Sequence, residues 1–191
     1  MSLLKDLLLV DNYDSFTHIL AHCLRVAGAH VTVVRNDAIG LSEARSFRRV
    51  VISPGPGIPS QAGITPELIA DRIGKVPILG VCLGHQALGE ALGGRLYWLP
   101  EVRHGQPGRL SVVREGTLLR GLGSAEVRIG LYHSWAIDPT SLRAQVLATD
   151  AEGVLMAFED VARGIFAVQF HPESILSSHG LVLLRNFTTL H

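Results

Sequence analysis

Hydrophobic positions in the first half of the chain follow two patterns, one typical of buried strands and one typical of amphipathic helices. Residues 7–10 form a continuous apolar run, as expected for a strand buried on both faces of a sheet. Over 16–27 the apolar residues recur at helical spacing and predict a helix, capped by Asp14 or Ser15 and ended by Gly28. Comparable patterns predict strands at 30–35, 49–53 and 76–81 and helices at 66–73 and 83–92. This order predicts a parallel sheet covered by helices on both faces.

The pattern changes after Gly94, where short strand-like segments follow one another without helices between them. These segments cover residues 109–114, 126–132, 144–149, 154–159 and 165–170. A last helix is predicted over 180–190, capped by Ser177 or Ser178. The expected fold class is therefore α/β, an open and mostly parallel sheet with helices on both faces and an antiparallel extension. Residues 1–191 are expected to form a single domain, because roughly 100–200 residues is the usual size.

Composition restricts the class of protein. The 17 Lys and Arg residues balance the 17 Asp and Glu residues, so the charge predicts neither a nucleic-acid partner nor a membrane surface. Hydrophobic residues make up 47% and charged residues 18%, which excludes a disordered chain. The 2 cysteines are too few for a disulfide framework, and no apolar run approaches the roughly 18 residues of a membrane helix. We therefore expect a soluble, cytoplasmic protein.

The candidate nucleophile is Cys82, which lies at the junction of a predicted strand and a predicted helix. Gly80 and Gly84 flank it, as the crowded turn of a nucleophile elbow requires. A helix N-terminus favours the reactive thiolate, and the N–H of Leu83 would point at an oxyanion on the attacked carbonyl. Cys23 lies on the apolar face of the first predicted helix and is instead expected to be a small buried hydrophobic residue.

The candidate base is His171, which ends the strand predicted over 165–170. In extended chain, residues i and i+2 project to the same side, so Glu173 can accept a hydrogen bond from the ring nitrogen that faces away from Cys82. Pro172 disfavours a helix at His171 and supports the extended conformation. Together these residues predict a Cys–His–Glu triad.

Other residues are expected at the same edge of the sheet. The loop SPGPG at 53–57 follows a predicted strand, and Gly55 could donate a second oxyanion N–H because glycine allows a close approach. Gln86 lies one helical turn after Cys82 and should face the same pocket. His85 is expected to make a structural hydrogen bond.

The remaining histidines do not predict a metal site. His18 and His22 have the i, i+4 spacing of two ligands, but they lie on the polar face of the first predicted helix without a third ligand. They are expected on the solvated surface, and no metal or other cofactor is predicted.

The motifs SPGPG, GVCLGHQ and FHPES, in this order and spacing, resemble those of the class I (triad-type) glutamine amidotransferases, which have a flavodoxin-like fold. Further motifs resemble the small subunits of anthranilate synthase and aminodeoxychorismate synthase. They are DNYDSFT at 11–17, RNDA at 35–38, GIPSQAG at 57–63, YHS at 132–134 and HPESILS at 171–177. The similarity runs over about residues 7–187, nearly the whole chain.

The resemblance implies a glutaminase. Cys82 would attack the side-chain amide of L-glutamine and form a thioester, His171 would protonate the departing ammonia, and Glu173 would hold the tautomer of His171. The amides of Gly55 and Leu83 match the oxyanion hole of the family. Residues implied to bind glutamine are Gly55, Pro56, Gly57, Gln86, Ser134 and Trp135. Ammonia would pass to a chorismate-binding large synthase subunit in a hetero-oligomer.

Two residues depart from the pattern of the family. Gln106 replaces the usual lysine in a loop associated with partner contact, and Trp135 replaces the usual aliphatic residue after YHS. The second change should be tolerated if the contact there is made by backbone only. The motifs leave open an anthranilate partner, an aminodeoxychorismate partner or both. A glutaminase subunit for guanylate or carbamoyl phosphate synthesis is a second interpretation, and a non-catalytic regulatory subunit is a third.

Overall fold

The computed structural model describes residues 4–122 and 126–190, so the ends of the expected 1–191 domain and residues 123–125 lie outside it. The strands are β1 (Lys5–Asp11), β2 (Val31–Arg35), β3 (Phe47–Ile52), β4 (Ile78–Val81), β5 (Arg95–Val112), β6 (Val127–Asp138), β7 (Gln145–Thr149), β8 (Leu155–Asp160) and β9 (Ile165–Val168). The α-helices are α1 (Thr17–Val26), α2 (Leu41–Ala44), α3 (Thr65–Arg72), α4 (Leu83–Ala91) and α5 (Gly180–Thr188).

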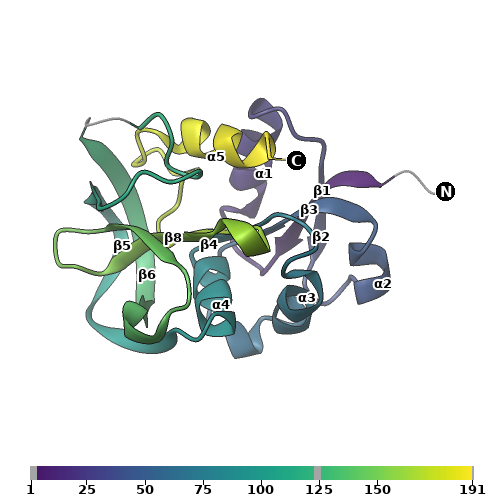
Figure 1. Ribbon diagram of the computed structural model, residues 1–191, viewed down its shortest axis with the longest axis horizontal. Helices are drawn as coiled ribbons and strands as arrows, with labels where there is room; N and C mark the ends of the chain where they lie inside the picture. Colours follow the sequence, from purple (N-terminus) through teal and green to yellow (C-terminus); the bar gives the residue numbers. More distant parts are fainter. Residues whose placement is uncertain (1–3, 123–125, 191) are drawn as a thin grey trace.

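One mixed sheet joins the strands of the described residues in the order β2-β1-β3-β4-β9-β8-β7-β5-β6. The first five of these strands are parallel, whereas each pair from β9 to β6 is antiparallel. Helices α1 and α5 cover one face of the parallel part, and α2, α3 and α4 cover the other (Figure 1). The predicted fold class is therefore confirmed.

The parallel strands are buried on both sides because helices cover both faces, which explains the unbroken apolar run of β1. Leu9 is fully buried and belongs to the hydrophobic cluster of α1 and α5. The next residue, Val10, is also fully buried and belongs to the cluster of α3 and α4. Successive side chains of a strand thus enter different cores, so neither face can be polar.

The antiparallel extension is longer than its pattern predicts. Strand β5 covers 18 residues, although only 109–114 was predicted, and β6 reaches Asp138 rather than Tyr132. The missed part of β5 is mostly exposed and contains proline, glycine and charged residues, so it has no alternating apolar pattern. It is a strand because it pairs with β6, with register shifts between Trp98 and Arg103 and between His104 and Gln106.

The start of α1 differs from the prediction. Its N-cap is Phe16, which makes no capping hydrogen bond through its side chain, and not Asp14 or Ser15. The Asp14 carboxylate instead accepts a hydrogen bond from the N–H of Phe16, one residue before the helix. Cys23 is partly buried and packs against the core cluster of this helix, whereas Ile19 is largely exposed.

The start of α5 also differs. Its N-cap is His179 and not Ser177 or Ser178. The two serine hydroxyls accept hydrogen bonds from β6 instead: Ser177 from the N–H of Gly130 and Ser178 from the N–H of Arg128. A partner distant in the chain therefore takes the groups that would otherwise cap the helix.

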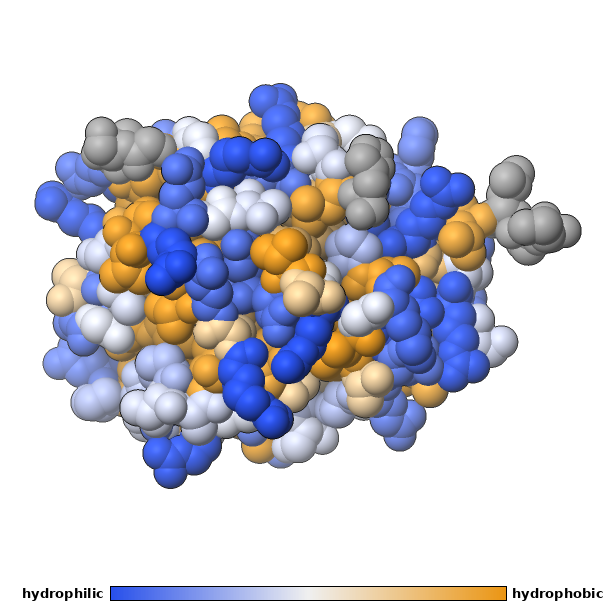
Figure 2. All heavy atoms as spheres, in the orientation of Figure 1, coloured by the Kyte–Doolittle hydropathy of each residue, from blue (hydrophilic) through white to orange (hydrophobic). Residues whose placement is uncertain are grey.

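Hydrophobic side chains also reach the surface. Figure 2 shows hydrophobic and hydrophilic residues interleaved on one face of the molecule. Among the large apolar side chains, Ile175 is 98% exposed. No helix within residues 4–122 and 126–190 has the length and the apolar content needed to cross a membrane.

Candidate active site

The sheet order brings the candidate residues together. Strands β1, β3, β4 and β9 are neighbours and run parallel, so the segments after their carboxyl ends meet at one edge of the sheet. These segments carry Asn12, the loop at 53–57, Cys82 and His171, respectively.

Cys82 lies on a tight turn between β4 and α4. Its backbone has φ 53° and ψ −102°, a conformation that a residue with a side chain rarely adopts. A Cβ on Gly84 would lie 2.4 Å from the carbonyl oxygen of Ile52, and one on Gly80 would lie 2.3 Å from that of Gly84. Only glycine therefore fits at either flanking position, which is the crowding expected of a nucleophile elbow.

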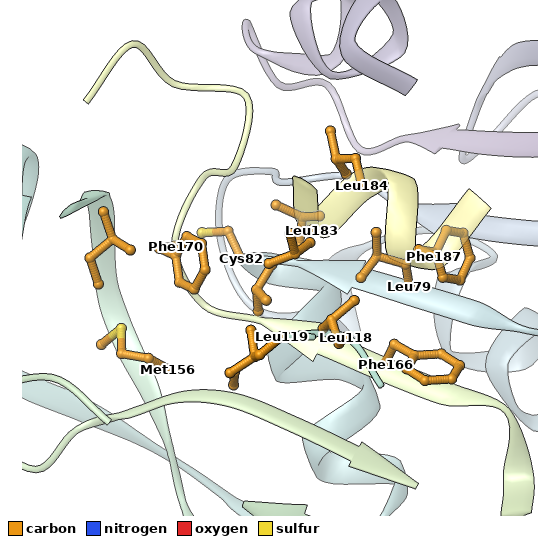
Figure 3. Packing of buried hydrophobic residues seen from close by; sticks show 14 of the residues in the cluster. Leu79, Cys82, Leu118, Leu119, Met156, Phe166, Phe170, Leu183, Leu184 and Phe187 are labelled. Atoms are coloured by element: carbon orange, nitrogen blue, oxygen red, sulfur yellow. The ribbon is translucent and has the colours of Figure 1, made fainter. Parts of the chain in front are cut away.

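The Cys82 side chain is only 6% exposed and belongs to a buried hydrophobic cluster with Leu79, Phe170 and Leu183 (Figure 3). Apolar surroundings disfavour a charged group. A thiolate here needs a compensating positive charge, which the N-terminus of α4 supplies in part. The rest has to come from a neighbouring side chain.

That neighbour is His171. Its Nδ1 lies 2.8 Å from Oε1 of Glu173, and both residues are buried. Burial lowers the pKa of His171, but the adjacent Cys82 and Glu173 side chains more than offset this and raise the pKa well above its ordinary value. Nε2 has no hydrogen-bond partner among the described residues, so Glu173 holds one nitrogen while the other remains available for proton transfer.

The backbone that brings His171 and Glu173 together is not extended, contrary to the sequence argument. Strand β9 ends at Val168, and the N–H of Ser174 donates to the carbonyl oxygen of His171 at 3.2 Å, which closes a turn. The Ser177 hydroxyl donates to the same oxygen at 2.6 Å. The expected His–Glu contact is present, but a hydrogen-bonded turn produces it.

Two aromatic rings for which the sequence predicted no role in the site pack against His171. The ring centroids of Phe16 and Tyr132 lie 5.2 Å and 4.8 Å from that of the imidazole. The Tyr132 hydroxyl is 3.1 Å from Oγ of Ser174, in the turn after His171. Both rings belong to motifs that were recognised only by resemblance, DNYDSFT and YHS.

A cavity of about 630 Å³ opens beside Cys82. The predicted residues that line it are Gly55, Pro56, Gly57, Cys82, Gln86, Ser134 and Trp135. Leu83, His171 and Glu173 are buried and are not among the lining residues. The remaining lining residues were given no role in the site by the sequence, although several belong to the DNYDSFT and YHS motifs; they are Tyr13, Asp14, Ser15, Trp98, His104, Tyr132 and His133.

The Gln86 side chain is held in one orientation. Its Nε2 donates to the carbonyl oxygen of Trp135 at 3.0 Å and to Oε1 of Gln169 at 3.2 Å, which leaves its own Oε1 to accept from a substrate. Trp135 lines the cavity, and its ring packs edge-on against that of Trp98, with the ring centroids 4.8 Å apart.

The predicted oxyanion donors are adjacent. A Cβ built on Gly55 would lie 3.0 Å from Cδ2 of Leu83, so the two residues are in contact. Leu83 is the first residue of α4, where backbone N–H groups have no partner within the helix. Two N–H groups at this position can stabilise negative charge on an attacked carbonyl oxygen.

The hydrogen bond expected of His85 is not formed. Both ring nitrogens lack a hydrogen-bond partner among the described residues, although the Gln169 side chain lies beside the ring. Burial and the nearby His133 lower the pKa of His85 to about 3, so the ring is neutral.

Comparisons with known proteins agree with this geometry. The glutamine amidotransferase class-I family model matches residues 8–190. The chain is 42% identical over 185 residues to aminodeoxychorismate synthase component 2 of Escherichia coli (strain K12), covering 95% of this chain and 98% of the relative. It is 43% identical over 186 residues to anthranilate synthase component 2 of Azospirillum brasilense, covering 95% and 94%.

A relative named for both activities, aminodeoxychorismate/anthranilate synthase component 2 of Bacillus subtilis (strain 168), is 40% identical and the alignment covers 95% of this chain and 94% of the relative. Among solved structures, a putative GMP synthase subunit from Thermoplasma acidophilum has a TM-score of 0.86 and 27% identity, with 98% and 94% of the two chains covered. The chain belongs to the class-I glutamine amidotransferase family.

Proposed function

We propose that this chain hydrolyses L-glutamine with a triad of Cys82, His171 and Glu173 and delivers the ammonia to a chorismate-converting synthase subunit. The observation that carries the proposal is the strained Cys82 turn beside the buried His171–Glu173 pair, at the wall of a cavity. Relatives at 40–43% identity are component 2 of anthranilate synthase, of aminodeoxychorismate synthase or of both.

In the first half of the reaction, the Cys82 thiolate attacks the side-chain amide carbon of glutamine. The oxygen of the tetrahedral intermediate takes up negative charge and accepts hydrogen bonds from the N–H groups of Gly55 and Leu83. His171 gives its Nε2 proton to the amide nitrogen, the carbon–nitrogen bond breaks, and ammonia leaves a γ-glutamyl thioester on Cys82.

In the second half, His171 removes a proton from a water molecule that attacks the thioester carbon. The carbon–sulfur bond breaks, glutamate leaves, and the thiolate and imidazolium are restored. Glu173 accepts from Nδ1 throughout and keeps Nε2 as the nitrogen that exchanges protons.

Glutamine would occupy the cavity beside Cys82. The backbone of 55–57 lines one part of it, and Gln86, Ser134 and Trp135 line another. The free Oε1 of Gln86 is suited to accept from an N–H of the substrate.

The ammonia acceptor is proposed to lie on another chain, a large synthase subunit that forms a hetero-oligomer with this one. Ile175, which is 98% exposed in the turn after Glu173, is suited to contact such a partner. Gln106, in place of the lysine of the family pattern, is exposed on β5 two residues after the cavity-lining His104. Residues 1–191 are proposed to act as one domain, in the cytoplasm, where two free cysteines remain reduced.

The test uses Cys82→Ala in complex with the large subunit of anthranilate synthase and, separately, with that of aminodeoxychorismate synthase. Product formation from chorismate is measured with glutamine or with ammonium as the nitrogen source. Glutamine-dependent activity should fall at least about 10³-fold, while ammonium-dependent activity is retained. The matched control is Cys23→Ala, which removes the other cysteine and should leave both activities unchanged. Glutamine-dependent activity that survives Cys82→Ala would contradict the triad.

A guanylate-forming partner is the second candidate, favoured by the similarity to the Thermoplasma acidophilum structure. It predicts complex formation with a guanylate synthetase and not with a chorismate enzyme. A non-catalytic regulatory subunit predicts that a diazo-ketone analogue of glutamine leaves Cys82 unlabelled in the complex, whereas the glutaminase predicts stoichiometric labelling.

A further inference from the structure

A buried polar network joins the end of β1 to the loop that carries Gly55. Asn12, the first residue after β1, is 3% exposed. Its backbone N–H donates to Oγ of Ser53 at 2.8 Å, and its side-chain Nδ2 donates to the carbonyl oxygen of Ser53 at 3.0 Å. Asn12 thus holds Ser53 through two hydrogen bonds at the point where β3 ends and the loop begins.

The orientation of the Asn12 amide is determined by its other neighbours. Its Oδ1 accepts from Nδ2 of Asn36 and from Oγ1 of Thr65, each at 3.0 Å. Since two donors point at the oxygen, the nitrogen is directed towards Ser53. A buried side chain whose nitrogen and oxygen both form hydrogen bonds has few alternative positions.

The loop itself has few other restraints. Ser53 donates its N–H to the carbonyl oxygen of Val10 and its hydroxyl to that of Pro54 at 2.6 Å. Pro54 and Pro56 have no N–H, and the N–H of Gly55 forms no hydrogen bond with a described residue. The position of Gly55 therefore depends on the anchor at Ser53 and on packing.

Packing also leads to Asn12. A Cβ on Gly55 would lie 2.6 Å from Cβ of Asn12 and 2.7 Å from its carbonyl oxygen, and on another side 3.0 Å from Leu83. The Gly55 backbone is seated between Asn12 and the residue that follows the nucleophile. A shift of Asn12 would displace the Gly55 N–H relative to that of Leu83.

We propose that Asn12 is a positioning residue of the glutaminase reaction, which orients the Ser53–Gly55 backbone so that the Gly55 N–H meets the oxyanion. The inference rests on the proposed function, because it assigns a task to the Gly55 N–H. Within the described part of the chain, Asn12 forms no hydrogen bond with Cys82, His171 or Glu173. It acts through the loop that carries Gly55. The DNYDSFT motif would contribute Asn12 to this task, and the RNDA motif would contribute Asn36, which donates to Asn12.

The kinetic consequence follows from where the oxyanion charge appears. A donor aimed at the tetrahedral intermediate stabilises the transition state more than the bound amide, so its displacement lowers kcat and leaves KM nearly unchanged. Removal of one such donor costs about 10²–10³ in kcat, and a displacement of about 1 Å can cost about 10²-fold.

The test is Asn12→Asp, which keeps the size of the side chain and an oxygen for Asn36 and Thr65 but replaces the donor that faces Ser53. Thr65→Val is the matched control, because it removes one hydrogen bond to Asn12, while Asn36 still donates to Oδ1 and keeps the amide nitrogen directed towards Ser53. Glutamine hydrolysis is measured on the full chain, alone and with the synthase subunit. We expect kcat of Asn12→Asp to fall about 10²-fold with KM within about 3-fold, and Thr65→Val to stay within about 3-fold of wild type in both.

Alkylation of Cys82 by iodoacetamide separates the loop from the nucleophile, since this displacement at a saturated carbon forms no oxyanion. Its rate should stay within about 3-fold of wild type in Asn12→Asp. A parallel loss of alkylation and turnover would show that the substitution disturbs the Cys82–His171 pair and would overturn the proposal. If Asn12→Asp does not fold, Ser53→Ala removes the loop side of the anchor and should still lower kcat at least about 10-fold.

An unchanged kcat in folded Asn12→Asp or Ser53→Ala, beside an active wild type, contradicts the role of Asn12 alone. A wild-type chain that hydrolyses no glutamine, alone or in the complex, contradicts the proposed function and the role of Asn12 with it.

Discussion

Acid should destabilise this protein through a histidine that is buried in its neutral form. His85 on α4 is 0% exposed, and its ring packs against Phe158 with the centroids 4.8 Å apart. Burial, and to a lesser extent the nearby His133, lower the pKa of His85 to about 3, while the Gln169 side chain has a smaller opposite effect. In the unfolded chain the same ring titrates near about 6.5. Below that pH the unfolded state binds a proton that the folded state does not bind, so stability falls as pH falls from about 6.5 towards 3.

The size of the effect follows from the two pKa values. At about pH 8 the ring is neutral in both states and contributes nothing to the pH dependence. At about pH 5 the unfolded ring is almost fully protonated and the folded ring is not, which lowers the free energy of unfolding by about 2 kcal/mol. This is a large part of the roughly 5–15 kcal/mol that stabilises a typical domain.

The assay is urea denaturation of wild type and His85→Leu at both pH values. Carboxylates and other histidines titrate over the same range in both proteins, so their contributions cancel in the comparison. Between pH 8 and pH 5 wild type should lose about 2 kcal/mol more than His85→Leu, with similar m-values. His22→Leu is the matched control, because it also replaces a histidine by leucine, but at an exposed position on α1. Equal acid losses in wild type and His85→Leu would refute the neutral buried histidine.

Two further predictions concern activity and assembly. Glu173→Gln removes a negative charge that raises the pKa of His171. The alkaline limb of the kcat/KM profile should therefore move to lower pH, and kcat should fall at least about 10-fold. An unchanged pH profile would contradict the role of Glu173. Ile175→Glu should leave the free energy of unfolding within about 0.5 kcal/mol of wild type but weaken binding to the synthase partner at least about 10-fold, measured by calorimetric titration. Val161→Glu is the control, since Val161 is also apolar and exposed but lies before β9, at the opposite end of this strand from His171. This variant should bind the partner normally. Equal affinities of the two variants would argue against the Ile175 contact.

Features that depend on neighbours in the chain could be predicted from the sequence. The apolar run of β1 is fully buried as its pattern indicates, because a strand covered on both faces admits no polar side chain. Gly80 and Gly84 are required beside Cys82, because the backbone crowds wherever a strand turns directly into a helix. Because β4 and β9 are parallel neighbours, Cys82 and His171, which follow their carboxyl ends, lie at the same edge of the sheet.

Features that depend on distant pairing could not be predicted in this way. The first part of β5 has no strand pattern, and it is a strand because β6 supplies its hydrogen bonds. Ser177 and Ser178 have the chemistry of helix caps, but β6 N–H groups bind their hydroxyls. In each case a partner tens of residues away competes with the local preference and prevails.

By itself, the sequence determined the α/β class and the glycine-flanked turn at Cys82, because each depends on local periodicity or on a spacing within a few residues. Only the tertiary structure decided which side chains surround the residues of the proposed triad. The packing of Phe16 and Tyr132 on the His171 ring and the hydrogen bonds of Asn12 to Ser53 join segments that follow different strands or belong to them. The physical reason is that a buried polar group is stable only when it is paired, and its partners are known only once the chain has folded.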